Sequence, residues 1–571
     1  MTETKLPPEI GSWLETFKKK HGRSPRVLHI GNIANNAYNN AKMLNNAGVD
    51  CDVICYDYYH IMGCPEWEDA DYRGEISDQL FPDWKTVDLN GFERPRWFAQ
   101  GPSTLCIDYL IAKRDGNMRA AAKLWRKLGK PEPSQSRRRA FWEHTTHLKR
   151  VLQNLQKPVQ SRIDGWRYLW YPFGSLLYHI YKVAEELLSI AILLALAPVI
   201  LAINLRTLIA FVAAHLRYKR RAMEPKSGED ISLTENGQSE IHNFAARAKR
   251  FVEIFAENFR QRADPLTPAD LEHYRHYIPR WKALFDRYDL IQAYSTDTAL
   301  PLVAGKRPYI GFEHGTLRIV LTEQGFVWRL ALLGYNQADH VFITNGDSLA
   351  YAADIGIKRF TPMLHPIQEE RVRSVQGDYR KLHETCGVKH IFLCTLRHDW
   401  AIKGTDKYIR ALPKLKELLG ADQFLVLMTT WGAQVDESRQ LADDLGVTEQ
   451  IKWITPLPKV KLIRMQKSVD VLFDQIALPH FGATAPEAIA SGVPVIMSYD
   501  PKSTEWIIPE PAPILSAWTV DEIVANVQLA LDPQWLAGYR VRGAMWIDNY
   551  HNDGVILRRH LDVYRSLLPV S

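Results

Sequence analysis

The sequence predicts an α/β protein built from two doubly wound domains that face a cleft. Short apolar runs recur along the chain, and each ends at a turn rich in Gly, Ser, Thr or Asp, as expected of strands whose carboxyl ends line a cleft. Helical stretches separate these runs, which is typical of parallel sheets. The chain has 571 residues, which is more than a single hydrophobic core normally organises. We therefore expect two or three domains.

The first domain is expected to span residues 26–364, after a polar leader at residues 1–25. It opens with a short buried strand that ends in the glycine turn at Gly31. This turn lacks the G-x-G-x-x-G pattern, which argues against a dinucleotide site. The elements predicted in this domain are strands at 26–32, 52–56, 290–294, 309–312 and 340–344, and a helix at 38–47.

The second domain is expected to span residues 365–543. Its predicted strands lie at 390–395, 424–429, 451–454, 469–473 and 494–496, with helical stretches between them. A terminal helix is predicted at 544–568. In this fold class such a helix usually crosses back, so we expect residues 544–571 to brace the first domain.

Composition excludes several classes of protein. The net charge of +6 is too small for a dedicated nucleic-acid binder, so no nucleic-acid partner is expected. The six cysteines form no C-x-x-C pair, which favours reduced thiols in a cytoplasmic protein. The first residues lack an apolar segment, so no signal peptide is expected.

An apolar insertion interrupts the first domain. Residues 187–205 contain no charged side chain, and about 20 apolar residues suffice to cross a bilayer. A single crossing would divide one parallel sheet between two compartments, and basic residues flank both ends of the segment. We therefore expect residues 160–221 to form a helical hairpin that attaches to the cytoplasmic face of a membrane without spanning it. A pair of buried core helices is the alternative.

Residues 481–496 read FGATAPEAIASGVPVI, a glycine loop that leads into a helix and then a buried strand. A loop of this kind presents free backbone N–H groups to a diphosphate. Gly482, Ala483 and Thr484 are the candidate contacts. Glu487 lies one turn into the helix, where its carboxylate can reach the hydroxyls of an attached ribose.

Residues 397–404 read RHDWAIKG and follow a predicted strand. Arg397 and Lys403 place two cations over one cleft, where they can neutralise the charge that develops on a departing nucleoside diphosphate. Arginine can bind two phosphate oxygens at once, whereas lysine acts as a point charge.

The two motifs resemble those of retaining GT-B glycosyltransferases of the family 4 type, within the glycosyl transferases group 1. The resemblance implies two Rossmann-like domains, a nucleotide-sugar donor and a reaction that retains the anomeric configuration. It also implies that Arg397 and Lys403 replace the divalent metal of other transferases, so no metal or other cofactor is expected. Together with the hairpin, it points to a lipid-linked saccharide or glycan acceptor, as in surface polysaccharide assembly.

The resemblance extends to strand ends of the first domain. His314 is the candidate to contact the donor sugar or the acceptor, with Glu313 as its orienting group or as a base. Asn32, at the first glycine turn, is a candidate contact to the donor phosphate or the acceptor. The sequence departs from the family pattern at Pro479, where relatives carry an acid beside the transferred sugar. We expect Asp474 to take over part of that contact.

Two weaker motifs and two other functions remain. Asp69-Ala70-Asp71 has the D-x-D pattern of metal-dependent transferases, but it lies in a charged run and is expected to be a solvated loop. His144 and His147 could share a helical face, yet no third metal ligand is evident. A sugar-nucleotide epimerase of the same fold would be soluble, and a catalytically silent member would bind the sugar nucleotide as a scaffold.

Overall fold

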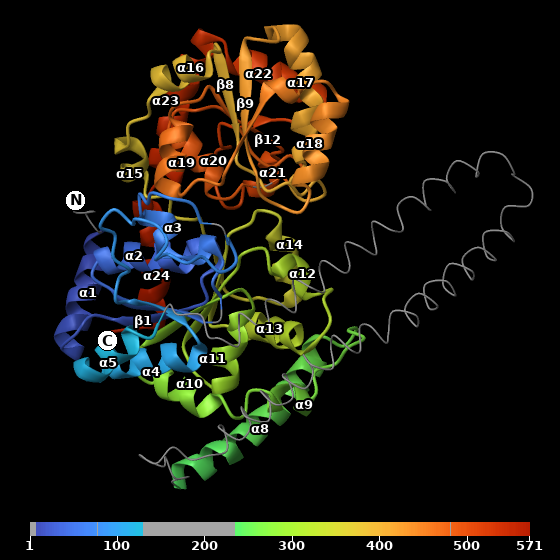
Figure 1. The fold of residues 1–571 in the computed structure, drawn as a ribbon. Helices are drawn as coiled ribbons and strands as arrows, with labels where there is room; N and C mark the ends of the chain where they lie inside the picture. Colours follow the sequence, from blue (N-terminus) through green and yellow to red (C-terminus); the bar gives the residue numbers. More distant parts are fainter. Residues whose placement is uncertain (1–6, 57, 77, 129–234, 480, 571) are drawn as a thin grey trace, which may run out of the picture. The chain divides into compact units, whose positions relative to one another are not determined.

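The computed structural model describes residues 7–56, 58–76, 78–128, 235–479 and 481–570, and only the backbone of residues 235–243. The described residues within 7–128 and 240–570 form one compact unit. This unit contains two parallel β-sheets with helices around them (Figure 1). The predicted pair of doubly wound, Rossmann-like domains is therefore confirmed.

Within the described residues, the first sheet has seven parallel strands in the order β3-β2-β1-β4-β5-β6-β7. Its strands are β1 Arg26–Ile30, β2 Asp50–Tyr56, β3 Phe98–Gly101, β4 Leu290–Tyr294, β5 Tyr309–Phe312, β6 His340–Ile343 and β7 Phe360–Pro362. The strand order reverses between β1 and β4, where Leu28 pairs with Ile291. Doubly wound sheets bind ligands at the carboxyl ends of strands around such a switch point.

The second sheet, counted over the same described residues, has six parallel strands in the order β10-β9-β8-β11-β12-β13. Its strands are β8 His390–Cys394, β9 Phe424–Thr429, β10 Ile451–Ile454, β11 Val471–Phe473, β12 Val495–Met497 and β13 Leu515–Ser516. Here the order reverses between β8 and β11, where Leu393 pairs with Leu472. The carboxyl ends of these two strands lead into the segments that carry the predicted phosphate-binding residues.

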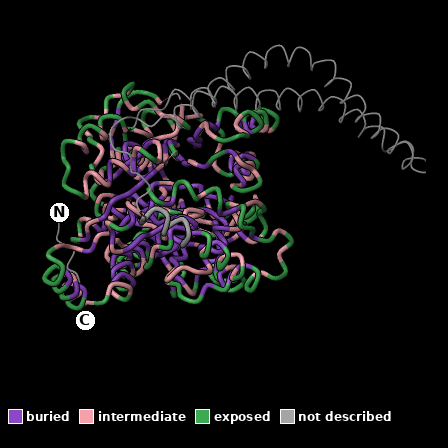
Figure 2. The backbone as a smooth tube through the Cα atoms, turned by 90° about the horizontal axis from the view of Figure 1, so that it is seen from below, coloured by how far each residue is buried: buried purple, intermediate pink, exposed green. Residues whose placement is uncertain are grey.

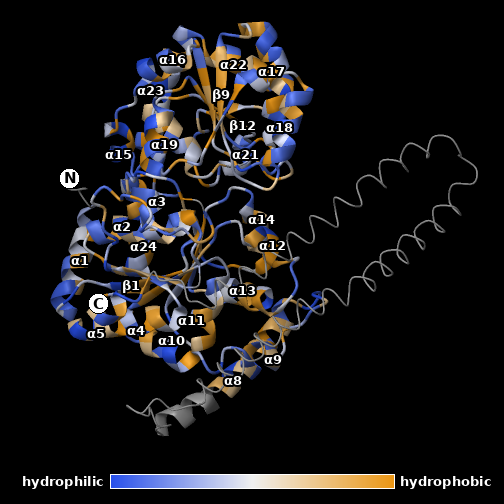
Figure 3. Cartoon of the chain, viewed as in Figure 1, coloured by the Kyte–Doolittle hydropathy of each residue, from blue (hydrophilic) through white to orange (hydrophobic). Residues whose placement is uncertain are grey.

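Helices cover both faces of each sheet, so the central strands are buried along nearly their whole length. All five residues of β4 are buried, and β8 is buried from its second residue onward. Figure 2 shows the buried backbone inside a rim of exposed loops, and Figure 3 shows hydrophobic residues along β9. Strands of parallel sheets that are buried on both faces read as continuous apolar runs.

The helices alternate with the strands in chain order. Those of the first half are α1 Pro8–His21, α2 Asn36–Asn46, α3 Pro65–Asp69, α4 Ser103–Arg114, α5 Met118–Trp125, α8 Glu235–Asn258, α9 Pro268–Glu272, α10 Ile278–Phe285, α11 Ala299–Ala304, α12 Leu317–Val320, α13 Phe326–Asn336 and α14 Ser348–Ile355. Those of the second half are α15 Glu369–Ser374, α16 Tyr379–Cys386, α17 Thr405–Leu419, α18 Val435–Asp444, α19 Lys459–Gln466, α20 Thr484–Ala490, α21 Pro501–Thr504, α22 Val520–Ala530, α23 Pro533–Tyr550 and α24 Asp553–Leu567.

Every strand predicted from the sequence is present, but β3, β7 and β13 were not predicted. These three strands contain four, three and two residues, and each lies at the edge of its sheet. Their sequences, FAQG, FTP and LS, contain no continuous apolar run that would separate a strand from a loop.

The prediction of one continuous terminal helix at 544–568 is wrong. The segment is helical, but α23 ends at Tyr550 and a second helix, α24, begins at Asp553. The side chain of Asn552 caps α24 by accepting a hydrogen bond from the N–H of Val555 at 2.9 Å. α24 then packs on the first sheet, where the Tyr564 hydroxyl donates to the side chain of Gln292 at 2.7 Å. α23 stays with the second domain, where the Tyr539 hydroxyl donates to the carbonyl of Val493 at 3.0 Å.

Two segments of the chain connect the domains, and hydrogen bonds join these segments to each other. The first runs from β7 to α15, and the second runs from α23 to α24. Nε2 of His551 lies 3.1 Å from the carbonyl oxygen of His365. The backbone N–H of Gln368 donates to Asp553 at 3.2 Å, and the N–H of Asp553 donates to Glu369 at 2.9 Å.

The predicted membrane hairpin at residues 160–221 lies outside the described residues, as do His144 and His147. Among the helices that are described, none combines the length and the apolar character that a membrane span requires.

Candidate functional site

The loop between β8 and α17 carries the two predicted cations. The Arg397 side chain is exposed, while Lys403 is half-buried and its ammonium donates to the side-chain oxygen of Gln475 at 2.5 Å. Gly404 ends the loop with a φ of +68°, and a Cβ atom there would lie 2.6 Å from the Ile476 side chain. The turn therefore requires glycine, and it fixes Lys403 beside the end of β11.

Asp474 follows β11 and lies close enough to Lys403 for each charge to act on the other. Burial raises the pKa of Asp474, and the charge of Lys403 opposes this rise. Burial lowers the pKa of Lys403, while Asp474 favours the charged ammonium and Arg397 disfavours it. The charges of Arg397, Asp474 and Asp399 thus all act on Lys403 at this edge of the second sheet.

His314, which follows strand β5 of the first sheet, lies within electrostatic range of Lys403. Burial, together with the charges of Arg318 and Lys403, lowers the pKa of His314 to about 4. The imidazole is therefore neutral at pH 7. The side-chain amide of Asn36 donates to Nδ1 of His314 at 2.9 Å, which leaves the ring proton on Nε2. His314 is thus positioned as a neutral hydrogen-bond donor near Lys403.

Arg397 faces a second group of side chains from the first domain, at Tyr58 and His60. Burial lowers the pKa of His60, and the charge of Arg397 adds to that effect. Burial raises the pKa of Tyr58 to about 12, and Arg397 opposes the rise. Polar groups of the first domain therefore lie within electrostatic range of both predicted cations.

Glu313 is fully buried, and its carboxylate is occupied by hydrogen bonds that join the ends of β5 and β6. It accepts from the N–H and the hydroxyl of Thr344 at 3.0 and 2.9 Å, from the amide of Asn345 at 2.9 Å, and from the N–H of Gly315. These bonds fix the turn that carries His314. They suit the orienting role expected of Glu313 better than a role as a base.

Asn32 is also enclosed by protein rather than presented to a ligand. Its amide nitrogen donates to Asn35 at 2.9 Å and to the carbonyl of Gly63 at 3.0 Å, and its oxygen accepts from the N–H of Tyr38 at 3.0 Å. Both amide hydrogens are taken. In this structure, Asn32 holds together the loops at the carboxyl end of β1.

The predicted phosphate loop leads into α20. Gly482 is exposed, Ala483 and Thr484 are half-buried, and Glu487 is 2% exposed. Both carboxylate oxygens of Glu487 accept hydrogen bonds from the ammonium of Lys459, at 2.8 and 2.9 Å. Burial raises the pKa of Glu487, and Lys459 opposes the rise.

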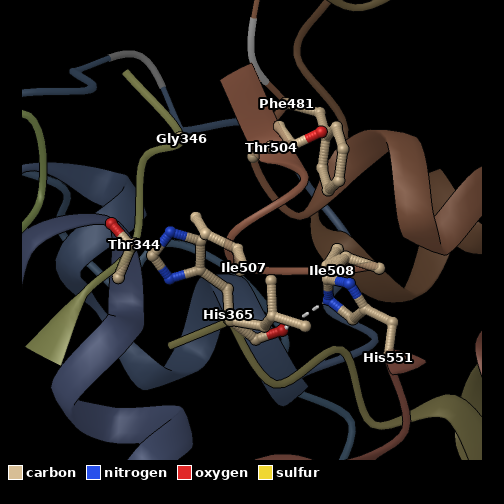
Figure 4. A pocket seen from close by; sticks show the side chains of 10 residues that line it. Thr344, Gly346, His365, Phe481, Thr504, Ile507, Ile508 and His551 are labelled. Atoms are coloured by element: carbon tan, nitrogen blue, oxygen red, sulfur yellow. Dashed lines mark hydrogen bonds between the residues drawn. The ribbon is translucent and has the colours of Figure 1, made fainter. Parts of the chain in front are cut away.

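A small pocket, partly open to solvent, adjoins this loop (Figure 4). It is lined by Thr344, Gly346, Leu364, His365, Phe481, Gly482, Thr504, Ile507, Ile508 and His551. The His365 ring lies beside Thr344, and its centroid is 5.3 Å from that of the His314 ring. Burial lowers the pKa of both His365 and His551, so both imidazoles are neutral. The pocket therefore lies between the glycine loop and the region of His314, and the side chains that line it are uncharged.

The D-x-D motif is not the solvated loop that the sequence suggested. Asp69 ends α3 with a side chain only 10% exposed, paired with Lys42 at 2.7 Å and with Arg371 at 2.5 Å. Asp71 pairs with Arg464 of α19 at 2.8 Å. The charged run at residues 66–71 is thus largely buried, because the fold brings basic side chains from other helices against its carboxylates.

Several residues near the site were not predicted from the sequence. Tyr58 and His60 lie in a segment without a motif, and Lys459 stands at the start of an ordinary amphipathic helix. In the sequence, Lys459 is simply a lysine that follows Pro458, and nothing there distinguishes it from a lysine on the protein surface.

Solved structures with a similar fold include sucrose-phosphate synthase from Thermosynechococcus elongatus, with a TM-score of 0.42 and 16% identity over 53% of this chain and 79% of that chain. Anabaena HepE in complex with UDP-glucose has a TM-score of 0.42 and 17% identity over 56% and 96%. WaaG, a glycosyltransferase involved in lipopolysaccharide biosynthesis, has a TM-score of 0.39 and 15% identity over 51% and 82%.

The sequence has no match among curated proteins. Residues 385–533 match the family model described as Glycosyl transferases group 1. The matched segment contains the cations of the β8–α17 loop, Asp474 and the glycine loop with Glu487. The second of the two Rossmann-like domains is therefore similar, over residues 385–533, to the glycosyl transferases group 1 domain.

Proposed function

We propose that this protein is a glycosyltransferase that transfers a sugar from a nucleotide-sugar donor to a lipid-linked saccharide, with retention of configuration and without a divalent metal. The observation that carries the proposal is that the neutral His314 lies within electrostatic range of Lys403, which in turn lies within range of Arg397. Two fixed cations can stabilise the charge on a departing diphosphate. A neutral imidazole can donate a hydrogen bond to the sugar without adding a further charge to the site.

The donor would lie against the second domain. Arg397 and Lys403 would contact the diphosphate, the backbone around Gly482 would contribute N–H groups, and Glu487 would accept hydrogen bonds from ribose hydroxyls. Asp474 is held beside Lys403, where it can contact the transferred sugar in place of the acid that Pro479 replaces. His314 would approach the same sugar from the first domain.

An assay of the purified protein with UDP-, GDP- and ADP-sugars, with and without a chelator, tests this proposal. A lipid extract from a bacterial envelope serves as the acceptor, and the linkage of the product reports the configuration. We expect transfer that persists in chelator. An epimerised sugar nucleotide would identify an epimerase, and binding without turnover would identify a scaffold. An absolute requirement for a divalent ion would contradict the proposed role of the two cations.

Replacing Glu487 by glutamine is expected to weaken nucleotide binding more than it slows turnover at saturating donor. The ribose hydroxyls would lose a charged acceptor, and a hydrogen bond to a charged group contributes about 1.5–3 kcal/mol. Calorimetry with the nucleoside diphosphate that binds the wild-type protein measures the effect. An unchanged affinity would place Glu487 outside the donor site.

Residues 160–221 are expected to attach the enzyme to the cytoplasmic face of a membrane. Their apolar side chains would sink into the acyl boundary, and the basic segment at residues 217–221 would meet anionic headgroups. High salt should release the protein only in part, whereas detergent should release it fully.

Charged replacements at Leu194, Leu196 and Ile200 are expected to move the enzyme to the soluble fraction while nucleotide binding is preserved. Fractionation of cells that express each form measures this. Wild-type protein that is soluble without detergent, or replacements that unfold the chain, would assign the segment to the protein core instead.

A further inference from the structure

The start of α19 carries a buried lysine whose ammonium is committed to a single carboxylate. Lys459 donates to both side-chain oxygens of Glu487, at 2.8 and 2.9 Å. The exposed fractions of the two side chains are 15% and 3%. This is a two-point contact in a nearly water-free place, where the orientation of the carboxylate is set by its partner.

Two further charged groups face this ion pair, one from α3 and one next to α20. Glu68 of α3 is buried, and its charge favours the charged form of Lys459 and disfavours ionisation of Glu487. Arg371 of α15 has the opposite effect on each. Arg371 is itself engaged, because it donates to the carbonyl of Glu68 at 2.7 Å and pairs with Asp69. Lys459 is therefore the cation in direct contact with Glu487.

Stability alone gives weak grounds for such a pair. The cost of removing two charges from water often matches the attraction between them, and apolar residues of similar size can serve as well. Ionisation of Glu487 has a different consequence, because an ionised carboxylate only accepts hydrogen bonds and offers about four lone-pair positions. Lys459 takes one position on each oxygen and leaves the others for a ligand.

We propose that Lys459 is a positioning residue for the nucleotide: it keeps Glu487 ionised and oriented so that the carboxylate can accept hydrogen bonds from ligand hydroxyls. This inference rests on the proposed function, in which Glu487 contacts the ribose. Lys459 itself need not touch the ligand. Its effect would be transmitted through the protonation state and the orientation of Glu487.

The test is calorimetric titration of UDP, GDP and ADP into the full-length protein between pH 6 and pH 9, for the wild type, Lys459→Met and Lys459→Arg. Without the ammonium, the pKa of Glu487 should rise further, because burial is then opposed less. Affinity depends on the ionised form, so it should be lost as the pH falls through that pKa. As the pH is lowered, Lys459→Met should lose nucleotide affinity at a higher pH than the wild type does. At pH 6 its affinity should be about tenfold or more below that of the wild type.

The two other variants calibrate this result. Lys459→Arg keeps a cation and should retain most of the wild-type pH profile. Lys461→Met removes a lysine from the same helix, one that lies over the Tyr72 ring, and should bind as the wild type does at every pH. The ligand phosphates titrate alike for every variant, so the differences between the profiles belong to the protein.

A double variant keeps the test decisive if Lys459→Met alone fails to fold. Lys459→Met with Glu487→Gln removes both charges of the pair, and it should bind with the affinity of Glu487→Gln alone. A uniform loss of affinity at all pH values in Lys459→Met, or additive losses in the double variant, would overturn the inference. If the wild type binds none of the three nucleotides, the proposed function falls first, and the inference with it.

Discussion

Replacing either Arg397 or Lys403 by alanine is expected to lower turnover by about 2–4 kcal/mol of transition-state stabilisation, the range observed when a preorganised charge contact is removed. The charges of Arg397 and Asp474 both act on Lys403, so the two cations belong to one electrostatic site. The loss should appear in turnover more than in donor affinity, because the charge on the leaving diphosphate grows in the transition state. Steady-state rates with the wild-type donor measure the effect.

Arg410→Ala is the matched control for these variants. Arg410 is exposed on α17, just beyond the loop that carries Lys403, and forms a surface pair with Asp406 at 3.3 Å. Its removal should leave the rate unchanged. Wild-type rates in Arg397→Ala and Lys403→Ala would remove both residues from the site.

Replacing His314 by alanine is expected to lower turnover by about 2.7–4 kcal/mol, comparable to the loss of one oriented hydrogen-bond donor at a reacting centre. The pKa of about 4 keeps the imidazole neutral, with its proton on Nε2. Below that pH the ring would gain a second proton beside Lys403, and the neutral donor would be lost. Between pH 6 and pH 8 its state is constant, so His314 should contribute no pH dependence there.

His314→Gln and Asn36→Ala separate the donor role from a structural one. Glutamine retains an N–H donor and should recover part of the rate that alanine loses. Asn36→Ala frees Nδ1 of His314 and should lower the rate by allowing the other tautomer. Rate profiles from pH 6 to pH 8 are the measurement, and a new titration near pH 6.5 that belongs to His314 would contradict the buried neutral state.

The sequence predicted the sheet centres well because the central strands are largely apolar runs that end at turn residues. The central strands β4, β5 and β9 begin and end at the predicted residues, and so does the edge strand β10. The edge strand β13 was missed because two residues carry no pattern. The break before α24 was missed because apolar residues continue on both sides of His551, and only the Asn552 cap marks it.

The candidate site shows the same division. Arg397, Lys403 and Gly482 are carried by motifs in which the spacing itself encodes the local geometry. Lys459 and His60 reach the site only through tertiary packing. No local sequence pattern identifies such residues. The run around Asp69 was wrongly predicted to be solvated because its basic partners lie on α2 and α15, far away in the sequence.

The paired connections between the domains set a limit on how they can move. A single linker would let the two halves swivel and slide independently. Here two connecting segments run between the domains. Hydrogen bonds join them, between His551 and the carbonyl of His365 and between Asp553 and the N–H of Gln368. Such a double tether resists twist and translation and leaves bending about the tether as the soft motion. The domains should therefore open by a hinge rotation about these two connecting segments, which would move the glycine loop at Gly482 away from His314.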